Sequence, residues 1–245
     1  MTALLAAEGS AQRPSRAKAV PASPAKAQYS QGLALAGSGR YAEAVAAFRE
    51  AVRLEPGWAE ARLNLGLALQ RAGQLDEAVV ELRAAADLKP ELAEAHSALG
   101  FALGQRNNLA GAIAEFEAAV KLDPKLQEAQ FRLGVTRWLA RDFAAAIGPL
   151  REAARLKPGH LESQYYLGRS LYETGARAEA VEALRRAVAL GPRVADVHAA
   201  LGTALAAGEE PDAAIESFRA ALAIDPNHLD ARNQLGLALI DKRDA

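Results

Sequence analysis

The stretch that decides the fold is residues 59–92, AEARLNLGLALQRAGQLDEAVVELRAAADLKPEL, because a variant of it follows at residues 93–126 and again along most of the chain. Proline recurs every 34 residues, and a glycine, two alanines and a large apolar residue keep the same step. The five series are Pro56 to Pro226, Gly32 to Gly236, Ala44 to Ala214, Ala51 to Ala221, and Phe48, Leu82, Phe116, Leu150, Leu184 and Phe218. A fixed period without an insertion indicates a solenoid or array of repeats.

Each unit is expected to form two helices, called here the A and B helices. In residues 59–92 the A helix is predicted over about 59–72 and the B helix over about 75–88, with Gly73 in the turn. Pro90 cannot continue the B helix, because it lacks an N–H and clashes with the preceding turn. Apolar residues at helical spacing would form one buried stripe on the B helix, namely Ala78, Leu82 and Ala85.

Small residues are predicted to set the distance between helices. Gly66 and Ala78 would let the A and B helices of one unit approach closely, and Ala85 would let the B helix pack on the next A helix. A longer side chain at such a contact should overpack it, at a cost of roughly 1–3 kcal/mol. Gly134→Leu is therefore expected to lower the melting temperature.

Counted from residue 25, the unit carries Leu at position 7, Gly at 8, Ala at 20, a large apolar residue at 24, Ala at 27 and Pro at 32. This pattern resembles the tetratricopeptide repeat, over nearly the whole chain. The resemblance implies an all-α fold, a right-handed superhelical solenoid of antiparallel helix pairs. Six full repeats would start near residues 25, 59, 93, 127, 161 and 195, with a lone A helix from residue 229, and A helices would line the concave face.

Position 4 departs from the family pattern, which often has Trp there. Polar residues occupy it in this chain, which predicts a more solvated A helix; they are Gln28, Arg62, His96, Gln130, Gln164, His198 and Arg232.

The two ends differ from the repeats. Residues 1–24 are rich in Pro, Ala and Ser and are expected to form a flexible leader. Residues 2–11 resemble the end of a secretory signal, although no positive side chain precedes the short apolar stretch. At the other end, Leu235 and Leu239 fall where a seventh B helix would cover them, so they are candidates for self-association.

Composition excludes several kinds of function. The 29 basic and 30 acidic residues give a formal net charge of −1, so nothing favours nucleic acid as a partner. There is no cysteine, which rules out disulfides, thiolate metal sites and cysteine nucleophiles. No apolar run approaches the roughly 20 residues of a membrane-spanning helix, so membrane insertion is not expected.

No catalytic, metal or cofactor site is predicted. Gly37, Gly39 and Ala42 have the spacing of a dinucleotide fingerprint, but a helix rather than a strand precedes them. The histidines fall at two positions of the repeat, in units that are two or three repeats apart, so no two are placed to hold one metal ion; they are His96, His160, His198 and His228.

Acidic residues at position 2 of the A helices form a row that could attract a basic partner. They also lie in the first helical turn, where a carboxylate complements the helix dipole by roughly 0.3–1 kcal/mol. The dipole explanation is favoured for most of them: Glu60, Glu94, Glu128, Glu162, Asp196 and Asp230.

A peptide-binding groove is predicted from the positions that face the concave side in this family. Those positions concentrate aromatic residues and an arginine in repeats 3 to 5, at Phe101, Phe131, Trp138, Tyr165, Arg169 and Tyr172. Aromatic and Arg side chains are the usual anchors of interfaces. The competing explanation is that the rings fill the space between neighbouring A helices.

Two ligand systems of the family are absent. Of the residues needed for the clamp that grips acidic C-termini of chaperones, only Asn64 is present, and no asparagine ladder occupies position 6. An apolar, aromatic groove suits an extended peptide or a partner helix. The alternatives are a self-associating scaffold, or the repeat portion of a larger enzyme or secretion assembly. The compartment stays open between the cytoplasm and, if residues 2–11 are a signal remnant, the periplasm or the exterior.

Overall fold

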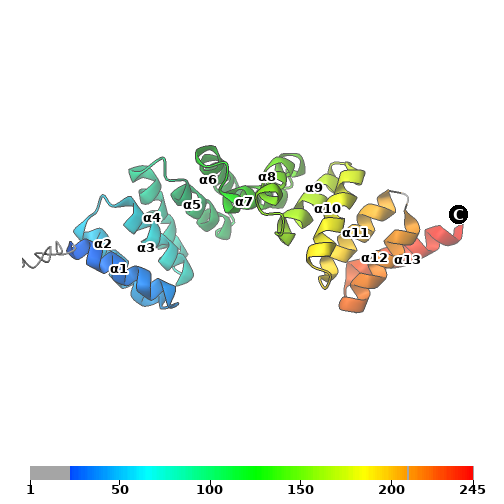
Figure 1. Cartoon of the computed structure of the whole chain (residues 1–245), viewed down its shortest axis with the longest axis horizontal. Coiled ribbons are helices and arrows are strands. Elements are labelled where there is room, and N and C mark those ends of the chain that lie inside the picture. Colours follow the sequence, from blue (N-terminus) through cyan, green and yellow to red (C-terminus); the bar gives the residue numbers. More distant parts are fainter. Residues whose placement is uncertain (1–22, 209, 245) are drawn as a thin grey trace, which may run out of the picture.

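The computed structural model describes residues 23–208 and 210–244, which form helices joined by short turns, with no strand among them. The helices stack side by side in chain order along one direction (Figure 1). The all-α solenoid of antiparallel helix pairs is therefore confirmed. Most of the predicted leader, and all of its signal-like segment, lies outside the described residues.

A and B helices alternate along the described chain. The A helices are α1 (Pro24–Gly37), α3 (Ala59–Arg71), α5 (Ala93–Gln105), α7 (Gln127–Leu139), α9 (Leu161–Glu173), α11 (Ala195–Ala207) and α13 (Leu229–Asp244). The B helices are α2 (Tyr41–Leu54), α4 (Leu75–Leu88), α6 (Leu109–Leu122), α8 (Phe143–Leu156), α10 (Arg177–Leu190) and α12 (Pro211–Ile224). Helix α1 begins one residue before the predicted start at 25, because the Ser23 hydroxyl caps it by accepting from the Lys26 backbone N–H at 3.2 Å.

Glycine at position 8 makes room for the large apolar residue at position 24 of the same unit. A Cβ on Gly134 would lie 2.8 Å from Leu150 Cδ2 and 3.2 Å from the Leu150 backbone nitrogen. The closest neighbour of Gly66 is likewise the Leu82 side chain, and the Ala78 carbonyl oxygen lies 3.3 Å from the added Cβ. The predicted close approach of the two helices thus serves mainly to seat the position-24 side chain.

The turn between the A and B helices needs a left-handed residue at position 15. Gly39, Gly73 and Gly175 have φ of 77°, 80° and 83° there. Repeats 3 and 4 place Asn107 and Arg141 at the same point, with φ of 59° and 62°. A residue with a Cβ is strained in this region, and asparagine tolerates it better than arginine does.

In five repeats the position-4 side chain bonds to the turn that precedes the A helix. Arg62 Nε donates to the Pro56 carbonyl at 3.0 Å, and Gln130 Nε2 donates to the Pro124 carbonyl at 3.1 Å. The same bond to a proline carbonyl is made by His96, His198 and Arg232. The expectation of a more solvated A helix is wrong for Gln130 and Gln164, which are both buried.

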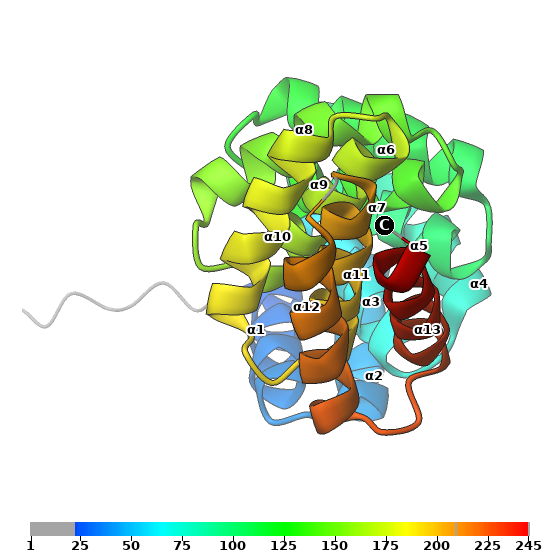
Figure 2. The same cartoon turned by 90° about the vertical axis from the view of Figure 1, so that its right-hand side faces the viewer.

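The A helices lie on the inner side of the superhelix. The backbone of each A helix lies close to that of the next A helix, whereas neighbouring B helices of the described chain lie farther apart and meet only through long side chains, as in the Arg151–Glu179 ion pair between α8 and α10. The units therefore curve with the A helices inside. Figure 2, which looks along the array, shows this curvature.

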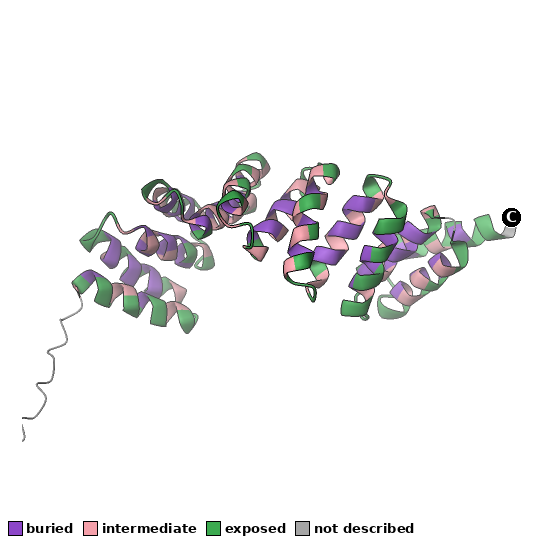
Figure 3. Ribbon diagram, turned by 45° about the horizontal axis from the view of Figure 1, so that its top comes forward, coloured by how far each residue is buried: buried purple, intermediate pink, exposed green. Residues whose placement is uncertain are grey.

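The apolar core divides into two clusters. One runs from Ala44 in α2 to Leu133 in α7, and the other runs from Ala146 in α8 to Ala238 in α13. Buried residues form the inner faces between helices, and exposed residues cover the outside (Figure 3). The buried polar residues of the described chain all lie near the boundary, in α7 and α9: Gln130, Thr136, Ser163, Gln164 and Ser170.

Candidate functional site

The six predicted groove residues all lie on A helices, and therefore on the inner side of the curve. Helix α5 carries Phe101, α7 carries Phe131 and Trp138, and α9 carries the remaining three. All six are half-buried, so each keeps part of its surface open to a ligand.

A cluster of rings joins α7 to α9, and its centre is Tyr166. The Tyr166 ring centroid lies 5.2 Å from Trp138, 5.2 Å from Tyr165 and 6.4 Å from Phe131. His160 extends the cluster, with its ring 4.7 Å from Phe131 in an edge-to-face arrangement. The rings thus pack between neighbouring A helices, as the competing explanation expected, and also remain partly exposed. Tyr166 was missed because position 6 is not among the positions used to predict the groove.

Arg169 sits against this cluster. Its guanidinium carbon lies 4.5 Å from the Trp138 ring centroid and 5.5 Å from that of Tyr165, in range for cation–π attraction. Its Nη1 also donates to the Tyr165 hydroxyl at 3.0 Å. Burial raises the pKa of Tyr165 above 10, an effect that Arg169 partly opposes. The phenol is therefore a neutral acceptor for the arginine at neutral pH.

Trp138 also contributes a polar group to the cluster. Its indole N–H is buried and has no hydrogen-bond partner among the described residues. A buried donor without an acceptor carries a desolvation cost of about 1–3 kcal/mol.

An apolar hollow of about 260 Å³ lies between α5 and α7. Phe101 and Phe131 line it together with Val135. The Arg132 guanidinium covers the Phe101 ring at 3.7 Å and is held there by an ion pair with Glu128 at 2.5 Å. Phe101 is therefore capped on one face by Arg132, which the sequence analysis had not assigned to the groove.

A second hollow, of about 190 Å³, adjoins the ring cluster on the other side. Arg169 is accompanied there by three acidic residues, Glu173 of α9, Asp196 of α11 and Asp230 of α13. The other lining residues include Tyr165, Tyr172, Thr203 and His228. His228 Nε2 donates to Asp196 at 3.2 Å, while His228 Nδ1 accepts from the Ala231 backbone N–H at 3.2 Å. The second bond fixes the proton of neutral His228 on Nε2.

The acidic row at position 2 is largely engaged within the protein. Glu60 binds Lys89 at 2.8 Å, and this bond lowers the pKa of the Glu60 carboxyl. Glu128 pairs with Arg132, and Asp196 accepts from His228. These contacts agree with a mainly structural role for the row.

Arg137 of α7 and Asn64 of α3 make their polar contacts within the protein. Pro149 lies inside α8 and has no N–H to offer the Ala145 carbonyl. Arg137 Nη1 donates to that carbonyl at 2.9 Å and also binds Glu117. Asn64, the residue that matched the chaperone clamp, donates to the Tyr29 hydroxyl at 2.9 Å.

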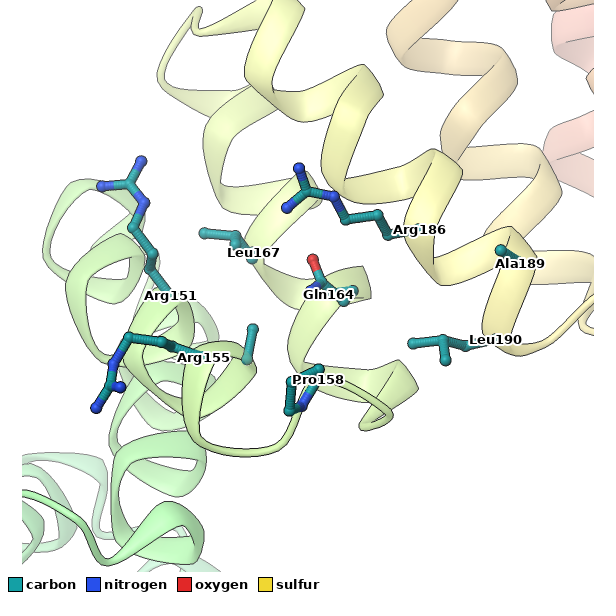
Figure 4. Close-up of a pocket in the computed structure, with 9 residues that line it drawn as sticks. Arg151, Arg155, Pro158, Gln164, Leu167, Arg186, Ala189 and Leu190 are labelled. Carbon is teal, nitrogen blue, oxygen red and sulfur yellow. The ribbon is translucent and has the colours of Figure 1, made fainter.

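A wider hollow of about 590 Å³ opens on the outer side, between α8 and α10 above α9 (Figure 4). Three arginines stand at its rim, and each is paired with a glutamate: Arg151 with Glu179, Arg155 with Glu152, and Arg186 with Glu182. The buried Gln164 lies at its floor, and its Oε1 has no partner among the described residues.

Helix α13 exposes an apolar surface. Leu235 is half-buried against the C-terminal core cluster, whereas Leu239 is 39% exposed. Leu237 and Ile240 are more exposed still, at 55% and 57%. A Cβ on Gly236 would meet nothing within 4 Å, in contrast to the position-8 glycines of the six full repeats.

Within residues 23–208 and 210–244 there is no group of His, Asp or Glu residues that could hold a metal ion. None of the helices described there is long and apolar enough to cross a membrane.

Comparison with solved structures supports the fold. YrrB, described as a TPR protein with an unusual peptide-binding site, matches 76% of this chain and 96% of its own, with 22% identity and a TM-score of 0.72. PilF from Pseudomonas aeruginosa matches 86% of this chain and 96% of its own, with 18% identity and a TM-score of 0.71. MamA from Desulfovibrio magneticus RS-1 matches 69% of this chain and 96% of its own, with 22% identity and a TM-score of 0.63.

No curated protein matches the sequence. The family model described as the tetratricopeptide repeat matches residues 29–93, 97–160 and 165–228, which is well over half of the chain. These segments contain the position-8 glycines of the six full repeats and the ring cluster of α7 and α9. The chain is therefore a member of the tetratricopeptide repeat family.

Proposed function

We propose that this protein is a non-catalytic interaction scaffold, and that the concave groove of repeats 3 to 5 binds an extended peptide or a helix of a partner protein. The observation that carries the proposal is the half-buried ring cluster of Phe131, Trp138, Tyr165 and Tyr166 on the inner side of the superhelix. Rings held in this way offer a large contact area and lose little conformational entropy when a ligand covers them.

The two hollows beside the cluster give such a ligand distinct places for its side chains. The hollow lined by Phe101, Phe131 and Val135 suits an apolar side chain, and the hollow at Arg169 and Tyr172 suits a polar one. A peptide that follows the groove would cross the ring cluster between them. YrrB, which shares the fold, is described as having a peptide-binding site, and this is consistent with peptide binding by a groove of this architecture.

The proposal is tested by panning a random peptide display library on the wild type and on the double variant Trp138→Ala/Tyr165→Ala. Peptides that the wild type enriches and the double variant does not would support the groove. Tyr41→Ala, which removes a half-buried aromatic side chain from the B helix α2, is the matched control and should enrich the same peptides as the wild type. If the wild type and the double variant enrich the same peptides, the groove is not the binding site.

A second candidate is self-association through α13. The exposed Leu237, Leu239 and Ile240 and the open side of Gly236 favour it, because a helix from another molecule could pack there. Light scattering at several concentrations would detect the assembly. Leu237→Lys should abolish it, whereas Val80→Lys, at a 64% exposed position on α4, should not. A mass equal to one chain at all concentrations would exclude this candidate.

A further inference from the structure

We infer that the outer hollow between α8 and α10 is a docking site separate from the concave groove. Its occupant is an acidic segment of a partner protein, which inserts an apolar side chain into the hollow and places carboxylates at the arginines of the rim. The inference does not depend on the groove, because the hollow opens on the side of the array that the B helices form.

The outer surface of the array changes its charge at this hollow. Helices α8 and α10, each taken with the four residues that follow it, carry seven basic and three acidic residues. Each of the other B helices, counted in the same way, carries more acidic than basic residues. The three rim arginines are joined by Lys157, Arg177, Arg185 and Arg193, and all seven basic residues are exposed. In a chain of net charge −1, this local excess attracts an acidic partner.

The lining of the hollow combines an apolar floor with a basic rim. Ala154, Leu167 and Leu190 contribute apolar surface, and the charged residues of the lining are all arginines: Arg151, Arg155 and Arg186. The volume of about 590 Å³ is in the range of ligand-binding pockets. The phosphates of a nucleic acid would use the arginines but not the apolar floor, so a protein segment with apolar and acidic side chains accounts for both features.

The ion pairs at the rim leave the arginines available to a partner. Each rim arginine is paired with one glutamate at between 2.6 and 3.1 Å, but the three arginine side chains are more than half exposed. Ion pairs at exposed positions contribute little to stability, so carboxylates of a partner can compete with these glutamates. The neighbouring Glu210 pairs with Arg185 at 3.4 Å, and basic residues still outnumber acidic ones on this surface.

The buried Gln164 is a second, independent indication of a ligand. It is 6% exposed, its Oε1 has no partner among the described residues, and its amide is directed into the space between α8 and α10 (Figure 4). In five other units the position-4 side chain bonds to the preceding proline carbonyl, whereas Gln164 makes no such bond to Pro158 within the described chain.

The fold supplies Gln164 with no polar neighbour of the kind found in other units. In repeats 2 and 3 a glutamate at position 23 binds the position-4 side chain, as Glu81 binds Arg62 at 2.7 Å. Position 23 of repeat 5 is Ala183, which is buried and cannot pair with Gln164. The terminal torsion of a glutamine is soft, so the amide can turn toward a polar group of an incoming segment.

The test compares Arg151→Glu with Arg49→Glu as the matched control. Both arginines occupy position 25 of a B helix, and both pair with a glutamate at position 19 of the next unit, Glu179 and Glu77 respectively. Arg49 lies on α2, outside the basic surface. A random peptide display library would be panned on the wild type, on both variants and on the groove variant Trp138→Ala/Tyr165→Ala. Far-UV circular dichroism would verify that each protein is folded.

We expect the wild type to enrich a set of peptides that combine acidic residues with a large apolar residue. Arg49→Glu and the groove variant should retain this set, and Arg151→Glu should lose it. A synthetic peptide from the set should bind Arg151→Glu at least about fivefold more weakly than the wild type. It should also bind Leu190→Asn more weakly than Leu88→Asn, a matched pair because both leucines occupy position 30 and are 40% and 47% exposed.

The contrary results separate the outer hollow from the groove. If Arg151→Glu keeps the peptides of the wild type, or if Arg49→Glu loses them equally, the inference about the outer hollow is wrong. If the groove variant alone loses the peptides, the outer site is refuted and the groove proposal stands. If Arg151→Glu alone loses them, the groove proposal fails and the outer site stands. Binding to phosphatidylserine vesicles that Arg151→Glu abolishes, without any peptide of the expected set, would also refute the inference, because the partner would then be a membrane surface.

Discussion

Replacing Gly134 by alanine should destabilise the protein, although alanine is the better helix former. A Cβ there would lie 2.8 Å from Leu150 Cδ2 and 3.2 Å from the Leu150 backbone nitrogen. Leu150 is 0% exposed, so its side chain has no open space to move into. Overpacking of this kind costs about 1–3 kcal/mol, against a gain of about 1 kcal/mol from helix propensity.

Gly236→Ala provides the matched comparison. Gly236 occupies the same position 8 in an A helix of the C-terminal core cluster, α13, and a Cβ added there would meet nothing within 4 Å. This variant should keep the gain from helix propensity without the clash. The free energies of unfolding of the two variants should therefore differ by about 1–3 kcal/mol, with Gly134→Ala the less stable.

The assay is urea unfolding followed by the fluorescence of Trp138, which lies in the same helix as Gly134, in a shared Trp58→Phe background. For a slope of about 2 kcal/mol/M, the two midpoints should differ by roughly 0.5–1.5 M. Equal midpoints would refute the packing argument, because the clash is the main difference between the two sites. A higher midpoint for Gly134→Ala would show that Leu150 can move.

Three further changes have expected outcomes. Pro149→Ala should raise the urea midpoint, by a free energy of up to about 3 kcal/mol, because it restores an N–H for the Ala145 carbonyl; an unchanged midpoint would mean that the Arg137 bond already compensates. Arg141→Gly should raise the melting temperature, by about 1 kcal/mol in stability, because φ is 62° there; a fall would show that the arginine side chain contributes more than the strain costs. Burial raises the pKa of Tyr165 in the folded state, so the unfolded state loses its proton first and stability should fall as the pH rises above 10. Melting temperatures of the wild type and Tyr165→Phe between about pH 9 and 11 should show a smaller fall in the variant, and parallel curves would contradict this.

The helix pairs were predictable from the sequence because one rule repeats in every unit. The turn at Gly73 and the end of the B helix before Pro90 follow from the backbone limits of those two residues. The close approach of the helices at Gly66 was predicted, but the packing of the Leu82 side chain on this glycine was not. Spacing along two helices does not define which side chain of the second helix meets the glycine.

The arrangement of the groove was less accessible to sequence reasoning. The six anchor residues were placed on the inner helices, but the contacts that join them depend on side-chain directions across two helices. Tyr166 contacts three of the rings from position 6, and Arg132 caps Phe101 from an adjacent helix.

The division of the apolar core into two clusters affects how cooperatively the array unfolds. In a linear array, stability depends on each unit and on its coupling to its nearest neighbours. We expect the apolar part of this coupling to be weakest near the middle, where the two core clusters meet and the buried residues of α7 and α9 are partly polar. The N-terminal and C-terminal halves should therefore behave as two cooperative blocks, and the ring cluster lies beside their junction. A ligand that spans α5 to α9 would contact both blocks and stabilise them together. The two blocks should then unfold in a single step.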